Sequence, residues 1–342
     1  MTARAKRTDT VRALSGARAL VTGAGGFIGS HLVERLCELG AEVTALFRYT
    51  SQGSVGALAG SEALREVKLQ FGDIRDPDCC ARAVKNQDFV FHLAAQIAIP
   101  YSYLSPRDFV ETNVVGTVNL LQAARDNQRL RRFLLMSTSE VYGSAQYTPI
   151  DEAHPLRPQS PYAASKVAAE ALVNSFAASF ELPLTVVRAF NTYGPRQSAR
   201  AVIPTIILQA LAGTRLRLGA TNTRRDFLFV SDTTLGVAQA AAAAKTVGAT
   251  INLCSGVDST IAEIVAKTGR ALDRKLAVVL DKQRVRPKRS EVARLLGDGS
   301  LAQTLCGFTP RTTLEDGLAE TIAWWRECGE RGEGRDAGVY RI

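Results

Sequence analysis

The sequence predicts an α/β fold in which a doubly wound parallel sheet carries a smaller C-terminal α/β lobe. Through the first half of the 342 residues, short and nearly continuous apolar runs alternate with segments of helical length. Strands of that kind are typical of parallel sheets covered by helices on both faces. A glycine-rich turn follows the first apolar run, as it does where such sheets bind nucleotides. After residue 191 the alternation fades, and shorter strands are interleaved with helices.

Each element follows from the apolar pattern. We expect the strands of the sheet at residues 19–22, 42–47, 67–71, 88–93, 132–137 and 184–188. We expect long helices at residues 108–125 and 161–180. The second of them begins with Ser160 and Pro161, a capping residue followed by a proline in the first turn. The smaller lobe should hold strands at residues 215–218, 227–230, 250–254 and 276–279, with helices at residues 202–212 and 231–244.

These elements suggest a basic N-terminal tail at residues 1–16 and a nucleotide-binding domain at residues 17–190. A substrate-binding lobe at residues 191–330, interwoven with that domain, and a loose tail at residues 331–342 complete the expected organisation. The net charge is +9, but much of the excess lies in the first 18 residues and at residues 284–289. No basic stripe is interleaved with aromatic residues, so we expect an anionic small molecule rather than nucleic acid as the partner.

Several classes of protein are not expected. No apolar run approaches the ~20 residues that span a bilayer, and the first residues lack the apolar core of a secretory leader. We therefore expect a cytoplasmic protein with no membrane partner. The six cysteines show no Cys-x-x-Cys pair and only three histidines are present, so we expect reduced thiols and no metal site.

The glycine-rich turn lies between the first expected strand and the first helix. Gly23, Gly26 and Gly29 have the spacing that permits a tight turn, close approach of the backbone to a pyrophosphate, and close helix packing. Phe27 and Ile28 begin the helix, whose N-terminus would face the anion. In this strand–turn–helix context the pattern predicts the dinucleotide site of a Rossmann fold.

The ends of the next two strands bear on the choice of nicotinamide cofactor. An acidic residue at the end of the second strand would bind the ribose 2′-hydroxyl, whereas an arginine would accept a 2′-phosphate. This strand ends at Arg48, with no acid, which favours NADP over NAD; Arg48 stacked on the adenine is the alternative. Asp73 and Ile74 follow the third strand and are expected beside the adenine, although Asp73 at this position also suits the cap of a turn.

A second group of polar residues is expected at the sheet edge. Tyr162 and Lys166 are four residues apart and share a helix face, where an ammonium would lower the pKa of a phenol and make it a usable acid and base. Thr138, Ser139 and Glu140 follow the fifth strand, at the edge where ligands of such sheets bind. Glu140 as the cap of the next turn is the structural alternative.

Taken together, these residues resemble the extended short-chain dehydrogenases, the NAD-dependent epimerase/dehydratase family, over residues 18–325. The resemblance includes residues 91–95, 112–114, 188–196, 225–227 and 286–292. It implies that Leu93, Ala94 and Ala95 contact the cofactor. Residues 96–103 and 197–204 resemble N-acetylglucosamine-nucleotide 4,6-dehydratases of the legionaminic-acid type, and residues 286–298 and Arg48 resemble GDP-mannose 4,6-dehydratases.

In family terms this implies an internal redox cycle on a nucleotide-diphosphate hexose related to UDP- or GDP-N-acetylglucosamine. Tyr162 would take the proton of the sugar 4-hydroxyl while hydride leaves C4, with Lys166 tuning Tyr162 and Thr138 holding the hydroxyl. Glu140 would remove the C5 proton before the 6-hydroxyl leaves as water. The glucose-type dehydratases that this triplet resembles have the sequence Thr-Asp-Glu there. Ser139 in the middle position implies that Glu140 must also deliver the proton to the leaving hydroxyl.

The resemblance also suggests how the substrate is held. Asn191, Arg225 and Arg286 match positions that bind the diphosphate in relatives, and arginine suits that task because its planar fork grips phosphate oxygens. Arg200 is expected at the same site. Tyr101 and Tyr103 are candidates for the sugar pocket, with a place in the core as the alternative. The family further implies a homodimer built on the long helices.

Three other functions stay open. A 4-epimerase or a uronate decarboxylase would use the same scaffold, and the Thr-Ser-Glu triplet also resembles uronate decarboxylases. A plain epimerase needs no C5 base, so Glu140 argues against it. A regulatory protein that senses the cofactor would be expected to lose Tyr162 or Lys166, and this chain retains both.

Overall fold

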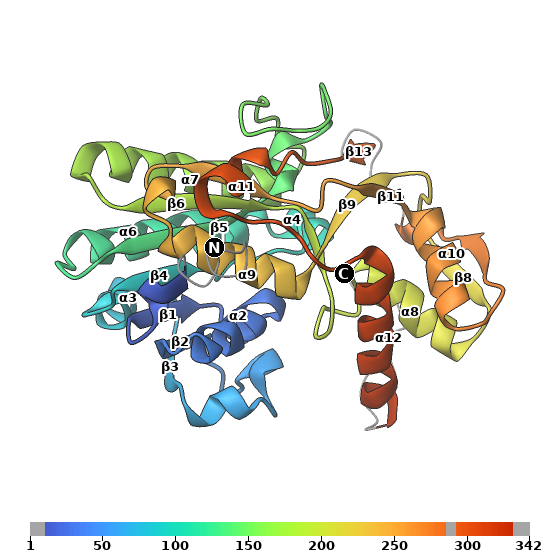
Figure 1. Ribbon diagram of the computed structural model, residues 1–342, viewed down its shortest axis with the longest axis horizontal. Helices are drawn as coiled ribbons and strands as arrows, with labels where there is room; N and C mark the ends of the chain where they lie inside the picture. Colours follow the sequence, from blue (N-terminus) through green and yellow to red (C-terminus); the bar gives the residue numbers. More distant parts are fainter. Residues whose placement is uncertain (1–10, 285–291, 331–342) are drawn as a thin grey trace, which may run out of the picture.

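The structure is a computed structural model that describes residues 11–284 and 292–330. Arg286, residues 1–10 and the expected tail at residues 331–342 lie outside the described residues. Figure 1 shows a large helix–sheet layer beside a smaller lobe that contains α8 and α12. Within the expected N-terminal tail, Arg12–Leu14 form a short 3-10 helix, η1, and Leu14 is fully buried. Folded structure therefore begins earlier than the sequence suggests.

The large layer is built on a sheet of seven strands in the order β10-β6-β5-β4-β1-β2-β3. All of its neighbouring strands pair in parallel. In chain order the strands are β1 (Arg18–Thr22), β2 (Glu42–Arg48), β3 (Lys68–Gly72), β4 (Phe89–His92), β5 (Arg132–Thr138), β6 (Leu184–Ala189) and β10 (Thr250–Leu253). The predicted α/β fold with a parallel sheet is confirmed.

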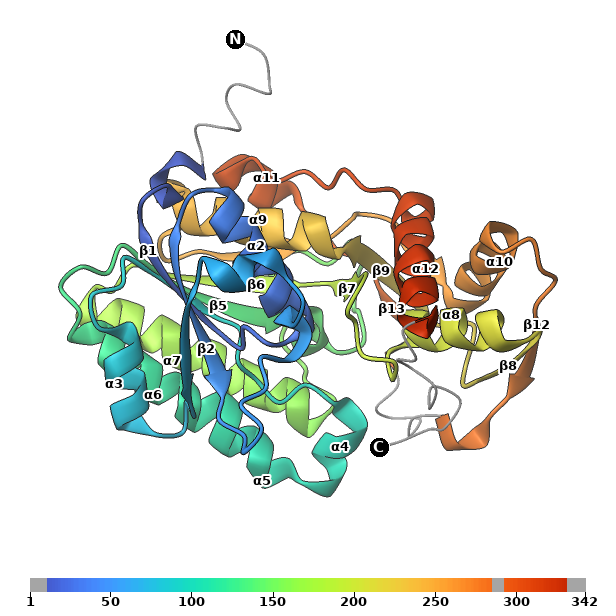
Figure 2. The ribbon, with the colours of Figure 1, turned by 90° about the horizontal axis from the view of Figure 1, so that it is seen from below.

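Helices cover both faces of the sheet, as Figure 2 shows. One face packs against α2 (Phe27–Glu38), α9 (Val230–Ala242) and α11 (Ser300–Cys306), and the other against α3 (Pro77–Val84), α6 (Gly116–Arg125) and α7 (Pro161–Phe180). Successive strand residues alternate between these two cores: Leu134 belongs to the first, and Phe133 and Leu135 to the second. Because both faces of the inner strands are buried, those strands are largely apolar. The edge strand β3 is the exception, since Lys68, Leu69 and Phe71 are exposed.

The expected helix at residues 108–125 is interrupted. It consists of α5 (Pro106–Phe109), a π-helical turn η4 (Val110–Val115) and α6, and a further helix, α4 (Ile99–Leu104), precedes it. The interruption coincides with Asn113, which is buried and makes hydrogen bonds outside the helix. At Gly116 an added Cβ would lie 2.6 Å from Ile74 Cδ1, so the helix packs closely on the turn after β3.

The smaller lobe has its own core. Its elements are β7 (Asn191–Tyr193), α8 (Val202–Ala212), β8 (Arg215–Leu218), β9 (Arg224–Phe229), β11 (Asp258–Thr260), α10 (Ile261–Ala271), β12 (Ala277–Leu280), β13 (Arg294–Leu295) and α12 (Leu314–Glu330). Strands β7, β9, β11 and β13 form one sheet, and β8 and β12 form another. Between β9 and β11 the chain returns to the large layer, where α9 packs on α2 and β10 extends the seven-stranded sheet.

Strand β9 begins at Arg224, three residues before the expected start, because its polar first residues pair with β11 and β13. Among the helices that the structure describes, none is long and apolar enough to cross a membrane. Within the described residues, Cys37, Cys79, Cys80, Cys254 and Cys306 form no disulfide.

Candidate active site

The glycine turn lies where the carboxyl end of β1 meets the N-terminus of α2. Gly23 has φ of +72°, and a Cβ there would lie 2.8 Å from Ala94 N. A Cβ on Gly29 would lie 2.1 Å from Gly23 O, so the turn and the helix can approach only because both residues are glycine. Gly26 is the N-cap of α2, and Phe27 is its first residue. The free backbone N–H groups at this helix end fit a dinucleotide pyrophosphate.

A cavity of about 170 Å³ opens beside this turn, at the ends of β1, β2, β3 and β4. Five residues expected at the cofactor, in addition to Gly23, line it: Arg48, Asp73, Ile74, Ala94 and Ala95. Leu93 directly precedes Ala94, and Ile28 follows Phe27 at the start of α2. The fold therefore gathers the predicted cofactor residues at one edge of the sheet.

Arg48 and Asp73 differ in their polar contacts. Asp73 accepts hydrogen bonds from Arg75, Nε to Oδ1 at 3.0 Å and Nη2 to Oδ2 at 2.6 Å. These hydrogen bonds lower the pKa of Asp73, with smaller contributions from the charges of Arg75 and Arg48. Asp73 also accepts from Arg75 N at 2.9 Å, so it caps this turn as well as lining the cavity. Arg48 is exposed, and no ion pair in residues 11–284 and 292–330 involves it.

The triplet of Thr138, Ser139 and Glu140 lies at the end of β5. Thr138 is the last residue of the strand and caps η5 (Ser139–Tyr142), where its Oγ1 accepts a hydrogen bond from Glu140 N at 3.2 Å. Ser139 is 2% exposed. Glu140 lines a second and larger cavity. The local turn thus buries Ser139 and directs Glu140 outward.

Tyr162 and Lys166 lie in the first turns of α7. Ser160 caps this helix by accepting a hydrogen bond from Ala163 N at 3.1 Å. Tyr162 packs edge-on against Phe109 with ring centroids 6.3 Å apart, and it makes a hydrogen bond with the Thr138 side chain. Lys166 is buried and its Nζ donates to Met136 O at 2.7 Å. The predicted catalytic residues from β5 and α7 therefore meet at the same edge of the sheet.

The electrostatics of Tyr162 differ from the expectation. The pKa of Tyr162 is raised to about 12: burial is the main cause, the hydrogen bond with Thr138 lowers the pKa in part, and the charge of Glu140 raises it. Burial also lowers the pKa of Lys166 to about 8, which the charge of Glu170 partly offsets. The pKa of Tyr162 is thus raised where the sequence predicted a lowered one, and the Lys166 ammonium is bound to the backbone of β5.

The larger cavity, of about 380 Å³, lies between the sheet edge and the smaller lobe. Glu140 lines it together with Asn191, Arg200 and Arg225, three of the residues expected at the substrate. Asn191 Nδ2 donates to Asp226 O at 3.2 Å, which fixes its amide beside β9. Arg284, which the sequence placed in a basic cluster but not at the site, also lines this cavity. The cavity wall thus carries the carboxylate of Glu140 together with the guanidinium groups of Arg200, Arg225 and Arg284.

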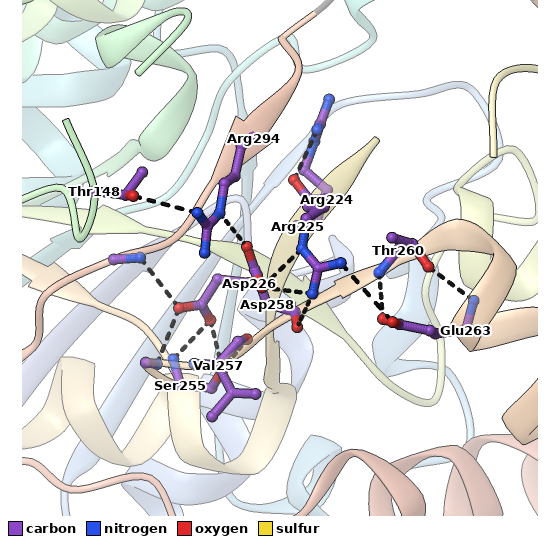
Figure 3. Close-up of polar contacts among 12 residues, drawn as sticks. Thr148, Arg224, Arg225, Asp226, Ser255, Val257, Asp258, Thr260, Glu263 and Arg294 are labelled. Carbon is purple, nitrogen blue, oxygen red and sulfur yellow. Dashed lines mark hydrogen bonds and ion pairs between the residues drawn. The ribbon is translucent and has the colours of Figure 1, made fainter. Parts of the chain in front are cut away.

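Arg225 is held by its neighbours on β9, as Figure 3 shows. The next residue, Asp226, is fully buried and accepts hydrogen bonds from Ser255 Oγ at 2.7 Å and Gly256 N at 2.9 Å. Burial raises the pKa of Asp226 to about 6 despite these donors. Arg224 donates from Nε to Asp258 Oδ1 at 3.0 Å on the neighbouring strand. These contacts hold the strand on both sides of Arg225, whose own Nη1 donates to Arg224 O at 2.9 Å where the side chain lines the cavity.

Tyr101 and Tyr103 do not line either of these two cavities. The Tyr101 hydroxyl donates to Asp108 Oδ2 at 3.2 Å, and its ring packs on Phe109. Their neighbour Pro100 lines the larger cavity instead. Helical geometry in α4 separates these side chains from that of Pro100, and the sequence alone did not indicate this helix.

Other lining residues were missed by the sequence analysis. Arg75, Gln96 and Thr112 line the smaller cavity, and Gln197, Thr205 and Thr223 line the larger one. Thr112 and Gln197 fall in stretches that carried the family resemblance, which is the one signal that marked them. The structure describes no group of three or more side chains arranged to hold a metal ion in the parts of the chain that it covers.

Comparison with known proteins agrees with this geometry. The model of the family described as GDP-mannose 4,6 dehydratase matches residues 20–321. The dTDP-glucose 4,6-dehydratase of Streptomyces griseus is 36% identical over 313 residues, which cover 90% of this chain and 94% of that protein. The UDP-glucose 4-epimerase of Mycolicibacterium smegmatis is 33% identical over 315 residues, which cover 90% of this chain and 98% of that protein.

Among solved structures, the crystal structure of DesIV is similar throughout. DesIV is a dTDP-glucose 4,6-dehydratase from Streptomyces venezuelae, solved with NAD and TYD bound. It superposes with a TM-score of 0.82 at 32% identity, covering 92% of this chain and 98% of that one. The family model spans most of the chain, and the motifs of the extended short-chain dehydrogenases lie at the site described above. The chain therefore belongs to the GDP-mannose 4,6-dehydratase family and is an enzyme of the nucleotide-sugar dehydratase group.

Proposed function

We propose that this enzyme is a nucleotide-sugar 4,6-dehydratase, which converts a nucleoside-diphosphate hexose into its 4-keto-6-deoxy derivative with loss of water. The observation that carries the proposal is the position of Glu140. Its carboxylate lines the cavity that Asn191, Arg200 and Arg225 also line, two residues after Thr138, which contacts the Tyr162 hydroxyl. A base at that point is required for removal of the C5 proton, and a plain 4-epimerase has no use for it.

The residues supply acid and base chemistry around the sugar ring. The residues of the glycine turn and the smaller cavity would hold an oxidised nicotinamide cofactor, which would supply the hydride acceptor for C4 and the hydride donor for C6. Tyr162 in its phenolate form takes the proton of the 4-hydroxyl, and the Thr138 side chain, which forms a hydrogen bond with Tyr162, orients that hydroxyl. The resulting 4-ketone makes the C5 proton acidic enough for Glu140 to remove. When hydride reaches C6, C5 regains a proton. That proton balances the one that Tyr162 took from the 4-hydroxyl.

Glu140 also has to assist departure of the 6-hydroxyl. Ser139 is nearly inaccessible and is a weak acid, so it does not offer a proton to the cavity. Glu140, having gained the C5 proton, passes it to the departing hydroxyl, which leaves as water. One carboxyl group thus performs two proton transfers that a Thr-Asp-Glu triplet would divide between two residues.

Residues 191–330 form the substrate-binding lobe in this proposal. Arg200 and Arg225 neutralise the diphosphate, with Arg284 at the same wall. A role for Arg286 remains a prediction, because this residue lies outside the described residues. For the sugar nucleotide, a UDP- or GDP-N-acetylglucosamine-like substrate follows from the sequence resemblance, and the relatives named above add dTDP-glucose to the candidates.

For the cofactor we propose NADP ahead of NAD. Arg48 is exposed at the end of β2, next to the smaller cavity, and an exposed guanidinium there suits a 2′-phosphate. DesIV was solved with NAD, so NAD is the competing choice. A homodimer and a cytoplasmic location remain predictions from the sequence.

The alternatives are a 4-epimerase, which the 33% identity to a UDP-glucose 4-epimerase supports, and a uronate decarboxylase. Mass spectrometry of reactions with UDP-, GDP-, CDP- and dTDP-linked hexoses and UDP-glucuronate separates all three. The proposal expects a product lighter by one water from one of the hexoses. Loss of carbon dioxide, or an isomer of unchanged mass, would replace it with the corresponding alternative.

A further inference from the structure

One buried histidine, His92, lines neither of the two cavities. His92 is the last residue of β4 and is 1% exposed. Its two ring nitrogens each contact a threonine hydroxyl: Nδ1 lies 3.0 Å from Thr22 Oγ1, and Nε2 lies 2.9 Å from Thr117 Oγ1. Thr22 directly precedes the glycine turn, whereas Thr117 belongs to α6. The ring therefore bridges two elements that are 95 residues apart in sequence (117 minus 22).

The surrounding hydrogen bonds fix which nitrogen carries the proton. Thr117 Oγ1 donates its hydrogen to Asn113 O at 2.6 Å, so it can only accept from the histidine. His92 Nε2 must then be protonated, and Nδ1 must accept from the Thr22 hydroxyl. Thr22 Oγ1 in turn accepts from Ala94 N at 3.1 Å. Only with Nε2 protonated and Nδ1 unprotonated does every donor in this series of hydrogen bonds have an acceptor. The imidazole is neutral in that arrangement.

Charge around the ring favours the same state. Burial lowers the pKa of His92 to about 3, and the nearby Lys166 ammonium lowers it further. Protonation of Nδ1 would make it a donor, so the Thr22 hydroxyl would lose the acceptor of its own hydrogen. A buried cation without an acid partner is also strongly disfavoured.

The chain of hydrogen bonds continues to the catalytic helix. The Asn113 side chain accepts from Gln96 N at 2.8 Å and donates to Gln96 O at 3.0 Å and to Ser165 Oγ at 2.9 Å. Ser165 Oγ donates to Tyr162 O at 2.7 Å. Ala94 and Gln96 both line the cofactor cavity. One connected network thus joins the glycine turn, the loop after β4, the π-helical turn and the residue pair at the start of α7.

We propose that His92 is a positioning residue, which as a neutral imidazole protonated on Nε2 holds the cofactor-binding turn in register with the helix that carries Tyr162. It touches neither substrate nor reacting atoms. Its effect is exerted through Thr22 on one side and through Thr117 and Asn113 on the other. Displacements of about 1 Å between reacting groups are enough to lower rates by up to ~100-fold, so a link of this kind governs turnover rather than substrate affinity.

The protonation state can be observed directly in the intact enzyme. Long-range ¹H–¹⁵N NMR spectra of protein labelled at histidine, assigned with a His92→Phe sample, report the tautomer of each ring. We expect the Nε2–H form for His92 and unchanged nitrogen shifts from pH 8 to pH 5.5. An Nδ1–H tautomer, or titration within that range, would overturn the proposal. This measurement needs no substrate and is independent of the proposed function.

Kinetics test the positioning role, and this arm rests on the proposed function. His92→Phe keeps an aromatic ring but removes both hydrogen bonds, and Thr117→Val removes the Nε2 acceptor while keeping the histidine. We expect both variants to lower kcat by about 10- to 100-fold with KM changed by no more than about twofold. His92→Gln, which can still donate near Nε2, should restore part of the loss.

The matched control is Phe91→Leu. Phe91 precedes His92 on β4, is fully buried, and belongs to the core on the opposite face of the sheet. It should lower stability with kcat within about threefold of the parent. If Phe91→Leu lowers kcat as much as His92→Phe and Thr117→Val do, the effect is general destabilisation and the proposal fails. Fluorescence titration with NADPH and NADH supplies a readout free of substrate: both network variants should bind the cofactor more weakly than Phe91→Leu, and equal affinities would contradict the link.

Discussion

Arg188 and Glu170 form a buried ion pair one helical turn beyond Lys166, with Nη2 of the arginine 2.8 Å from Oε2 of the glutamate. The two side chains are 7% and 2% exposed. Arg188 also donates to the Tyr142 hydroxyl at 2.9 Å, and Glu170 accepts from Ser137 Oγ. The pair thus ties β6 to α7 behind the catalytic residues.

Removal of one partner should destabilise the fold strongly. Arg188→Met leaves the Glu170 carboxylate buried without its cation, and we expect the free energy of unfolding to fall by about 3–5 kcal/mol. Arg129→Met is the matched control, because Arg129 is half exposed and pairs with Asp88 at 3.2 Å; its loss should stay below ~1 kcal/mol. Urea denaturation measures both. Equal losses would show that the buried pair has no special weight.

A second ion pair joins the cofactor helix to the loop after β7 and gives a pH dependence. Arg196 Nη2 lies 2.7 Å from Glu34 Oε1. Burial by itself raises the pKa of Glu34, but hydrogen bonds from Arg196 and Ser61 outweigh it and hold that pKa below its ordinary value of 4.5. A depressed carboxyl pKa contributes stability that is present above the ordinary value and is lost as pH falls through the folded-state value.

We therefore expect Glu34→Gln to lower Tm at pH 7 by an amount equivalent to about 0.5–1 kcal/mol. The difference from the parent should shrink as the pH falls below 4.5. Glu62→Gln, which breaks an exposed pair with Arg65, should change Tm little at either pH. Thermal unfolding followed by circular dichroism checks this. A difference that persists unchanged at pH 3 would contradict the assigned ion pair.

Tyr162→Phe should nearly abolish turnover while leaving substrate binding intact. The variant loses the group that takes the 4-hydroxyl proton, which typically costs ~10²–10⁴-fold in rate. The diphosphate contacts at Arg200 and Arg225 are untouched, so affinity for the sugar nucleotide should be close to that of the parent. Steady-state kinetics and calorimetry measure the two effects. Turnover near the parent rate would exclude Tyr162 as the acid–base residue.

Arg48→Ala tests the choice of cofactor. The variant should lose more affinity for NADP than for NAD, because only NADP carries the 2′-phosphate that the guanidinium would bind. Calorimetric titration with each cofactor gives the comparison. Equal losses for the two would assign Arg48 to stacking on the adenine. NAD as the sole cofactor retained by the purified parent would also count against the preference.

The sequence predicted those parts of the molecule whose residues are constrained locally. Most residues of β1, β4, β5 and β6 are buried, so these strands are largely apolar and stand out in the sequence. Gly23 and Gly29 are fixed by close backbone contacts, and the start of α7 at Pro161 by the cap of Ser160. The same constraints make the glycine turn and the start of α7 recognisable from the sequence alone.

Other features depend on tertiary contacts that leave little trace in the sequence. The π-helical turn at Val110–Val115 coincides with side-chain bonds of Asn113 to a distant loop, and nothing in the periodicity of residues 108–125 marks it. Arg284 reaches the larger cavity only because of the fold of the smaller lobe. The phenol pKa was misjudged because spacing on a helix places Lys166 near Tyr162 without revealing that Nζ is bound to Met136 O.

The most direct test of the account separates the two halves of the reaction at Glu140. In Glu140→Gln, Tyr162 and Lys166 remain, so oxidation at C4 should still occur, but the amide cannot accept the C5 proton. Mixing this variant with the sugar nucleotide that the parent dehydrates should therefore build up reduced-cofactor absorbance near 340 nm, and in deuterated water C5 should gain no deuterium. The parent should show only a transient absorbance, and its product should carry deuterium at C5. Normal product from the variant, or exchange at C5 at the parent rate, would contradict the assignment of Glu140 and return the epimerase to consideration.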